Sequence, residues 1–384
     1  MTGTRTAAAN FTAPDTTLIL SAMALLLIGL VAISSASIEY ADWHYQNAWH
    51  HTQRHLIYLC IALTTGGVLY CVRPQFWLDT GWGWLFGSLA LLILVLIPGI
   101  GKEVNGSQRW LALGGFTLQP SEFAKLAVVV YLAGYMVRRE HEVRNEWQGF
   151  LKPMAVLFAT TLLLMIEPDF GATVIVAATT FGMLFLAGVK LGHFMLVLAG
   201  AVAAGLVLIV SAPYRLQRLA SYTDPWADPF GSGFQLTQSL IAFGRGEWIG
   251  VGLGNSVQKL FYLPEAHTDF VFSIWVEETG FVGAIAVIGL YTALIGRMLW
   301  AGRQALSVEN PFGAYICYGV ALVFSGQAFV NMGVSCGLLP TKGLTLPFVS
   351  YGGTSLIVCC AMFALVLRID RDTREQQGKK RRCK

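Results

Sequence analysis

The feature that most constrains the fold is a series of long apolar runs that recur along the whole 384-residue chain. A helix needs about 17 to 25 apolar residues to cross the roughly 30 Å hydrocarbon core of a bilayer. Only 12% of the residues are charged, against about 25% in soluble domains. We therefore expect an all-α, polytopic integral membrane protein forming one domain over residues 1–384. Its transmembrane helices should number about ten, and they are predicted over residues 18–36, 56–72, 81–98, 123–137, 153–166, 170–189, 191–211, 270–296, 312–334 and 346–367.

Two of these runs, 123–137 and 153–166, are short for a full crossing. We expect each to include flanking polar residues or to be tilted and partly shielded by its neighbours. The first run follows a polar tail, residues 1–16, that has no cleavage-like site. We interpret it as a retained helix and not as a signal peptide.

The basic residues predict the orientation of the chain. With the N-terminus inside and ten crossings, the inside segments hold 17 of the 26 Lys and Arg residues. Eight of these lie in the tail over residues 368–384. This pattern follows the positive-inside rule and places both termini in the cytoplasm. We expect the spans to lie in a bacterial inner membrane. The basic tail is interpreted mainly as a topology anchor near anionic lipid, with a specific partner site as the alternative.

Two outer segments interrupt the apolar pattern, residues 99–122 and residues 212–268. The second is a large periplasmic loop between the seventh and eighth helices, and loops of this length tend to be functional. Its apolar stretch 236–243 is predicted to form a short helix lying in the membrane interface. Gly250, Gly252 and Gly254 have the spacing of a phosphate loop, but no strand precedes them, so nucleotide binding is not supported.

Carboxylates next to apolar runs are the sharper functional signal, because charge within a bilayer is costly and usually faces the bundle interior. From the residues alone, Asp269 is either an acid that complements the dipole of the following helix or a functional group. Glu277 is about 80° round the helix from Asp269 and is expected to support its side, while Glu278 pairs elsewhere. Structural ion pairs remain the alternative for both. Glu167 and Asp169 flank a proline and are interpreted as a solvated corner.

Four motifs make the chain recognisable. They are NGSQRW at 105–110, LQPSEFAK at 118–125, LPEAHTDFVFSIWVEETG at 263–280 and NMGVSCGLLPTKGLTLPFVSYGGTS at 331–355. Together they resemble the SEDS family (shape, elongation, division and sporulation), and the similarity covers nearly the whole chain. The PTKGLTLPFVSYGG stretch is more similar to the cell-division branch of that family than to its elongation branch.

The resemblance implies a peptidoglycan glycosyltransferase that polymerises lipid II at the outer face of the membrane, at the division septum. It also implies a partner, a class B penicillin-binding protein transpeptidase. In the division complex this is FtsI, activated through FtsQ, FtsL, FtsB and FtsN. Membrane lipids are expected as further contacts, and nucleic acid is not.

The essential outer aspartate of the family falls on Asp269, which the resemblance implies to be the general base. Arg109 and Lys125 are expected to hold the lipid pyrophosphate, with anchoring or snorkelling at the interface as the alternative for each. Glu122 is expected to orient either cation. Further substrate-binding candidates are Arg218, Lys342, Glu277 and Ser350, the last in an SYGG turn expected to act through its backbone shape.

No cofactor is expected, and no DxD pair or zinc spacing is present in the sequence. A divalent cation is left open, and His267 is expected to shape the loop. Two other functions stay open, a lipid II flippase and a purely structural divisome scaffold. A flippase should present a polar path from the inner side, whereas a scaffold has no reason to place Asp269, Arg109 and Lys125 at the outer level.

Overall fold

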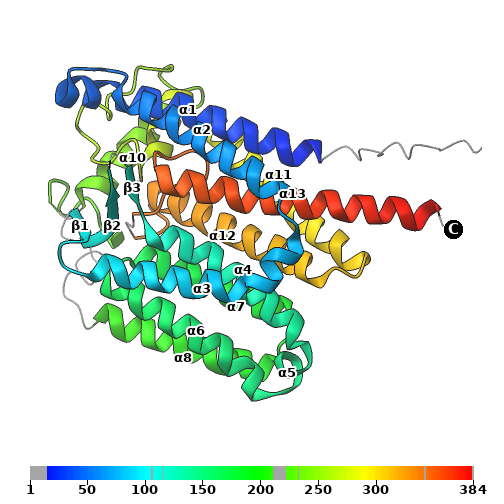
Figure 1. The fold of residues 1–384 in the computed structure, drawn as a ribbon. Coiled ribbons are helices and arrows are strands. Elements are labelled where there is room, and N and C mark those ends of the chain that lie inside the picture. The colour runs from blue at the N-terminus through cyan, green and yellow to red at the C-terminus, as the bar shows by residue number, and fades with distance from the viewer. Residues whose placement is uncertain are drawn as a thin grey trace, which may run out of the picture.

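The computed structural model describes residues 15–104, 107–114, 116–210, 222–231, 233–340 and 343–382. It is a bundle of long helices that run side by side, with a small sheet and a short helix at one end (Figure 1). The helices are α1 (Thr16–Tyr45), α2 (His50–Cys71), α3 (Pro74–Leu96), α4 (Pro120–Arg138), α5 (Glu140–Asn145), α6 (Trp147–Ile166), α7 (Phe170–Leu186), α8 (Leu191–Val210), α10 (Phe234–Gly246), α11 (Val271–Ser307), α12 (Pro311–Ser335) and α13 (Gly353–Arg382).

Every one of the ten predicted apolar runs overlaps one of these helices. Within the described residues, eight helices are long and apolar enough to cross a bilayer, and α7 and α8 are shorter apolar helices. The two short runs do extend into polar flanks, because α4 has 19 residues and α6 has 20. The last run is predicted too early, since α13 begins only at Gly353 and Leu346 to Ser350 form a turn.

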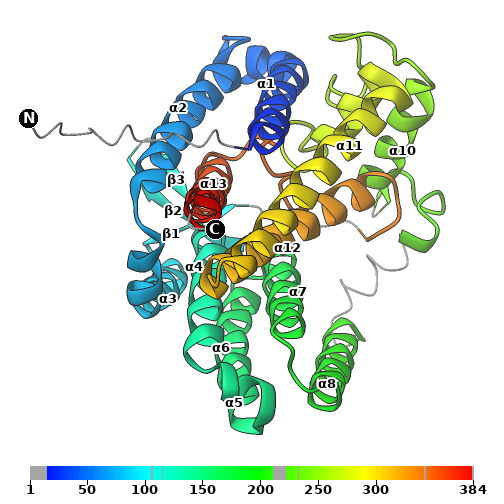
Figure 2. The same cartoon turned by 90° about the vertical axis from the view of Figure 1, so that its right-hand side faces the viewer.

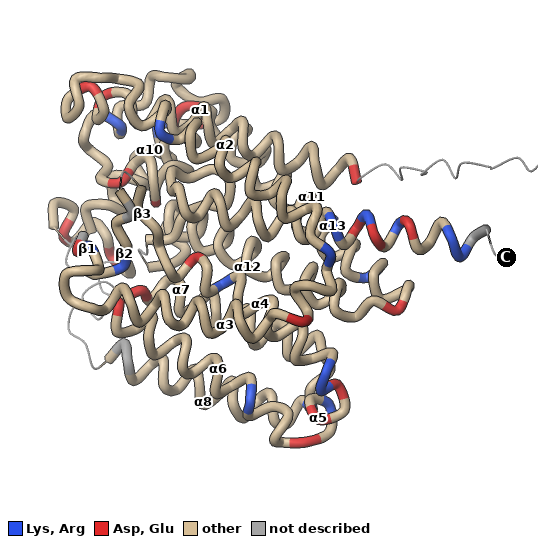
Figure 3. Tube along the Cα trace, in the orientation of Figure 1, with Lys and Arg blue, Asp and Glu red and all other residues tan. Residues whose placement is uncertain are grey.

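The two ends of the bundle differ in charge and in structure. Lys and Arg gather at the end where α5, the start of α1 and the last turns of α13 lie (Figure 3). There Asp15 caps α1 and pairs with Arg297 of α11 and Arg374 of α13, the second pair at 2.7 Å. The sheet and α10 lie at the opposite end. This arrangement agrees with the predicted placement of the basic segments on one side.

The sequence did not predict the sheet. Strands β1 (Gly101–Val104), β2 (Ser107–Leu113) and β3 (Phe116–Leu118) pair antiparallel in that order. The strands are three to seven residues long, and the register shifts between Lys102 and Glu103. Such short, irregular strands give almost no two-residue alternation from which they could be recognised.

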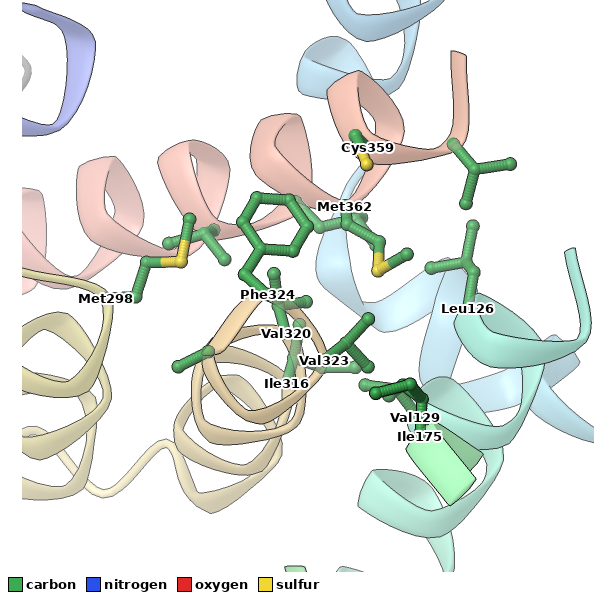
Figure 4. Packing of buried hydrophobic residues seen from close by; sticks show 14 of the residues in the cluster. Leu126, Val129, Ile175, Met298, Ile316, Val320, Val323, Phe324, Cys359 and Met362 are labelled. Carbon is green, nitrogen blue, oxygen red and sulfur yellow. The ribbon is translucent and has the colours of Figure 1, made fainter. Parts of the chain in front are cut away.

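Buried apolar side chains from several helices form the core. Seen along the bundle, α13 and α12 lie near the middle and α8 lies at the rim (Figure 2). α4 is the most enclosed of the candidate spans, with 89% of its apolar window buried. Figure 4 shows the packing where α4, α7, α11, α12 and α13 meet, through Leu126, Val129, Ile175, Met298, Ile316, Val320, Val323, Phe324, Cys359 and Met362.

Helix α11 is interrupted at Gly280, which has φ of 70°. The turn that follows α10 lies against this break and bonds its free backbone groups. Val251 N–H donates to the Glu277 carbonyl at 3.0 Å, and Phe281 N–H donates to the Glu247 carbonyl at 2.9 Å. The break lies about 14 Å along the helix from its start, so part of the segment between α10 and α11 reaches well into the bundle from the end that carries the sheet. The short helix predicted in this loop is confirmed as α10.

Candidate active site

Asp269 lies directly before α11, at the end of the bundle that carries the sheet. The N-cap position belongs to Phe270, and no side-chain hydrogen bond caps α11, so Asp269 does not serve as the cap of this helix. Its carboxylate lies against the loop that follows α12, because a Cβ atom on Gly343 would be 2.9 Å from Oδ2 of Asp269. The peptide carbonyl of Asp269 accepts a hydrogen bond from Asn331.

The surroundings of Asp269 favour its protonated form. Burial and the neighbouring negative charge of Glu265 raise the pKa of Asp269 to about 7, while Arg109 acts in the opposite direction and Asp169 adds to the rise. A carboxylate with a pKa near the working pH is well suited to accept a proton during the reaction. The half-buried side chain is therefore a candidate general base.

Arg109 projects from β2 onto the turn between α6 and α7. Its Nε donates to the Glu167 carbonyl at 3.1 Å and its Nη2 to the Pro168 carbonyl at 2.5 Å. Arg109 is close enough to Asp269 and Glu167 to act on the pKa of both carboxyl groups. The structure thus brings Arg109 and Asp269 to one site, with part of the guanidinium already engaged by the protein.

Lys125 and Glu122 form an ion pair inside the bundle. Their charged groups are 2.8 Å apart, and the residues are 1% and 4% exposed. Of the two cations that Glu122 was expected to orient, Arg109 and Lys125, it therefore orients Lys125. A buried ammonium needs a partner of opposite charge, and here that partner is Glu122. In this conformation Lys125 is not presented at the surface of the outer end.

Glu277 does not support the side of Asp269, contrary to expectation. It bonds the outer loop, accepting from the Ser256 hydroxyl and from the Val257 N–H at 3.2 Å. Glu278 accepts from the Ser256 N–H at 3.4 Å and from the Ser35 hydroxyl at 2.5 Å, and it pairs with Lys259 at 3.5 Å. The two carboxylates share one buried polar cluster, because Ser256 donates its hydroxyl to Glu277 and its N–H to Glu278.

The other predicted substrate-binding residues are Ser350, in the SYGG turn, and Arg218 and Lys342. Ser350 is buried, and its hydroxyl accepts from the Leu346 N–H at 2.8 Å, so it closes the turn before α13. Gly353 allows α13 to approach α2, because a Cβ atom there would lie 2.3 Å from the Tyr58 ring. Arg218 and Lys342 lie outside the described residues.

The corner formed by Glu167 and Asp169 is buried, which corrects the expectation of a solvated turn. The two residues are 1% and 3% exposed. Asp169 caps α7 through the Ala172 N–H and also accepts from the Ser121 hydroxyl at 3.0 Å. Burial and Asp169 raise the pKa of Glu167 to about 8. An aspartate directly before an apolar run is the sequence signal for this cap.

His267 shapes the loop before Asp269. Its carbonyl accepts from the Tyr351 N–H at 3.0 Å, and its ring packs on those of His51 and Tyr351, with centroids 4.9 and 5.6 Å away. Burial lowers the pKa of His267 to about 4, so its ring is neutral at pH 7. Among the described residues, no group of three carboxyl, imidazole or thiol side chains is arranged to hold a metal ion.

An apolar groove of about 730 Å³ opens between α2, α3, α4 and α13. It extends from Trp77 at one end of the bundle to Phe123 and Leu126 of α4. These two residues belong to the same turns of α4 as Glu122 and Lys125. The groove therefore reaches the level of the buried ion pair from the lipid-facing side of the bundle.

Comparison with known proteins identifies close relatives. The model of the FtsW/RodA/SpoVE cell cycle protein family matches residues 15–375. The chain is 52% identical to a probable peptidoglycan glycosyltransferase FtsW of Pseudomonas fluorescens, over 95% of this chain and 89% of that protein. It is equally identical to the protein of the same name from Nitrosococcus halophilus, over 94% of this chain and 93% of the relative.

Solved structures agree over almost the whole chain. A chain from the structure described as "Structural coordination of polymerization and crosslinking by a peptidoglycan synthase complex" superimposes with a TM-score of 0.76 at 31% identity, covering 94% of this chain and 98% of that one. The rod shape determining protein RodA of Thermus thermophilus gives a TM-score of 0.70 at 28% identity, with the same coverage. The chain expected from its motifs to be a SEDS protein therefore belongs to the FtsW/RodA/SpoVE family of cell cycle proteins.

Proposed function

We propose that this protein is a peptidoglycan glycosyltransferase of the FtsW type, which polymerises lipid II into glycan strands for septal cell-wall synthesis. The family membership and the names of its relatives support the reaction class. The single structural observation that carries the mechanism is Asp269, a half-buried carboxylate at one end of the bundle, whose pKa is raised to about 7. In the reaction, Asp269 takes the proton of the acceptor sugar hydroxyl as that oxygen attacks the anomeric carbon of the donor.

The leaving group is a lipid pyrophosphate, which departs as an anion and needs positive charge more than a second acid. Arg109 is the cation that acts electrostatically on Asp269, and we assign this role to it because its Nη1 is not used in the two bonds to the Glu167–Pro168 turn. Lys125 is buried against Glu122, so it acts on the substrate only when that pair opens. The apolar groove between α2, α3, α4 and α13, with a volume of about 730 Å³, is the site proposed for part of the polyprenyl chain.

The remaining assignments rest on family resemblance and on charge. The end of the bundle with the sheet is the periplasmic face, and the basic end with both chain termini is cytoplasmic. The partner is the class B penicillin-binding protein FtsI of the septal complex, acting with FtsQ, FtsL, FtsB and FtsN. One neighbour in fold comes from a peptidoglycan synthase complex, which supports a polymerase that works together with a crosslinking enzyme.

The test is polymerisation of labelled lipid II by the purified protein together with its transpeptidase, with and without Mg²⁺. Asp269→Asn should abolish glycan formation, because the amide cannot accept the proton. Glu103→Gln, which changes an exposed carboxylate in β1, is the matched control and should polymerise like wild type. Equal chain yield from Asp269→Asn and wild type would overturn the general base. An inactive wild type that still translocates lipid II in vesicles would instead identify a flippase.

A further inference from the structure

Two loops that come from distant parts of the chain meet at Asp269. One is the segment before α11, which contains Asp269 itself. The other follows α12 and contains Gly343, against which the carboxylate of Asp269 lies. The catalytic geometry depends on how these two loops are held relative to each other, so the contacts that bridge them matter for the reaction.

Asn331 of α12 bonds both loops with one side-chain nitrogen. Its Nδ2 donates to the Asp269 carbonyl at 2.8 Å and to the Leu344 carbonyl at 2.6 Å. The residue is 1% exposed, so water does not replace either bond. A carboxamide nitrogen has two hydrogens, and here each is used on a different loop.

We propose that Asn331 is a positioning residue for the glycosyl transfer, fixing the Asp269 carboxylate against the Gly343 loop at the distance that the reaction requires. The inference rests on the proposed function of Asp269. The Asn331 amide nitrogen bonds peptide carbonyls and not the carboxylate, so it acts through Asp269. Its helix is central, since α12 packs on α4, α7 and α11, and functional groups are held more accurately by helices and strands than by loops.

Two further contacts limit what the loops can do without Asn331. The Tyr351 N–H bonds the His267 carbonyl, which ties the Asp269 loop to the turn before α13. The Thr345 and Ser355 hydroxyls are 2.8 Å apart, which ties the Gly343 loop to α13. Neither contact joins the two carbonyls that Asn331 bonds, those of Asp269 and Leu344. The loss of Asn331 therefore releases these two carbonyls while the other two contacts remain.

The test replaces Asn331 with Asp, which keeps the shape of the side chain and removes both hydrogens. The Asp269 and Leu344 carbonyls then face the carboxyl oxygens of the new aspartate and lose their amide donor. Misplacement of a reacting group by about 1 Å can cost roughly a hundredfold in rate. We expect kcat for lipid II polymerisation to fall by about that factor with KM nearly unchanged. Asn331→Gln, which keeps two hydrogens on one nitrogen, should recover a substantial part of the rate.

A second readout separates positioning from simple loss of folding. The charged groups that act on Asp269 are Glu265, Arg109 and Asp169, and burial is the largest influence. In Asn331→Leu, which removes both hydrogens without adding a carboxyl group near Asp269, release of the loop to water should move the acid limb of the pH–rate profile below its wild-type position. A variant that merely folds less well gives lower activity with an unchanged profile. That outcome, or wild-type kinetics in Asn331→Asp, would overturn the role of Asn331.

The matched control is Gln327→Met, one turn away on the same helix. Gln327 is 0% exposed, and its two polar atoms have no hydrogen-bond partner among the described residues. An apolar residue of similar size should therefore leave the rate and the pH profile unchanged. The two hypotheses fail separately. An active Asp269→Asn would refute the proposed base, whereas an inactive Asp269→Asn with a fully active Asn331→Asp would refute only the positioning role.

Discussion

Replacing Asp269 with asparagine should remove catalysis and yet make the folded protein more stable at neutral and alkaline pH. The pKa of Asp269 is raised from its ordinary value of 3.8 to about 7, first by burial. The folded state therefore binds a proton that the unfolded state has already released between these two values. Because stability falls with pH wherever the folded state binds more protons, the wild type loses stability between about pH 4 and pH 7.

The size of this effect follows from the shift. Each pKa unit corresponds to about 1.4 kcal/mol, so relative to acid pH the fold loses at most roughly 4 kcal/mol by pH 8, where Asp269 is ionised. By pH 5 it loses roughly 2 kcal/mol, because the unfolded chain has released the proton that folded Asp269 still holds. Water contact of the half-buried side chain reduces both values. An asparagine side chain does not titrate, so the advantage of Asp269→Asn should increase as the pH rises.

Thermal unfolding in detergent at pH 5, 6, 7 and 8 measures this difference directly. The midpoint of Asp269→Asn should rise above that of wild type by a few degrees more at pH 8 than at pH 5. Glu103→Gln, at an exposed position, should show no such widening. A constant difference between Asp269→Asn and wild type over this range would refute the reasoning from burial.

Further predictions concern the reaction and the outer loop. The kcat/KM for lipid II should rise with pH through about 7, because the base must be ionised; a flat profile between pH 5 and 8 contradicts the assignment. Lys259→Met and Glu278→Gln should each lower stability by about 3 to 5 kcal/mol, and the double variant by less than their sum, as measured by thermal unfolding. Gly280→Ala should release the turn after α10, because a Cβ atom would lie 2.4 Å from the Gly250 nitrogen, and limited proteolysis there should increase. Gly296→Ala, where a Cβ atom meets nothing within 4 Å, should be cleaved like wild type.

The number and type of the main elements could be predicted because the length and polarity of a run determine whether it can cross a bilayer. The ends of the helices could be predicted less accurately. Residues 346–352 are mostly apolar and resemble part of a span, but they form a turn in which the Ser350 hydroxyl accepts the Leu346 N–H. That bond depends on the fold and leaves no periodic signal in the sequence.

The candidate site was predicted in part. Asp269 and Arg109 do lie at one place, and their motifs identified them. The burial of Lys125 was not foreseen, because one charged residue in an apolar run looks the same whether its helix is central or peripheral. Asn331 opens the 331–355 motif but was not singled out as a site residue, because the sequence does not show which peptide carbonyls its amide bonds. Its role becomes visible only when the two loops are seen together.

The break in α11 has a consequence for how the protein is made. Within a bilayer, an unbonded backbone group costs several kcal/mol, and the groups freed at Gly280 are bonded by the Glu247–Gly252 turn. That turn precedes α11 in the chain, and in the proposed orientation it lies on the outer side of the membrane. Helix α11 thus reaches its final form only after the loop has been translocated and has folded back. In this orientation, the end of the protein that holds Asp269 is completed late during membrane insertion, together with the loop before α11.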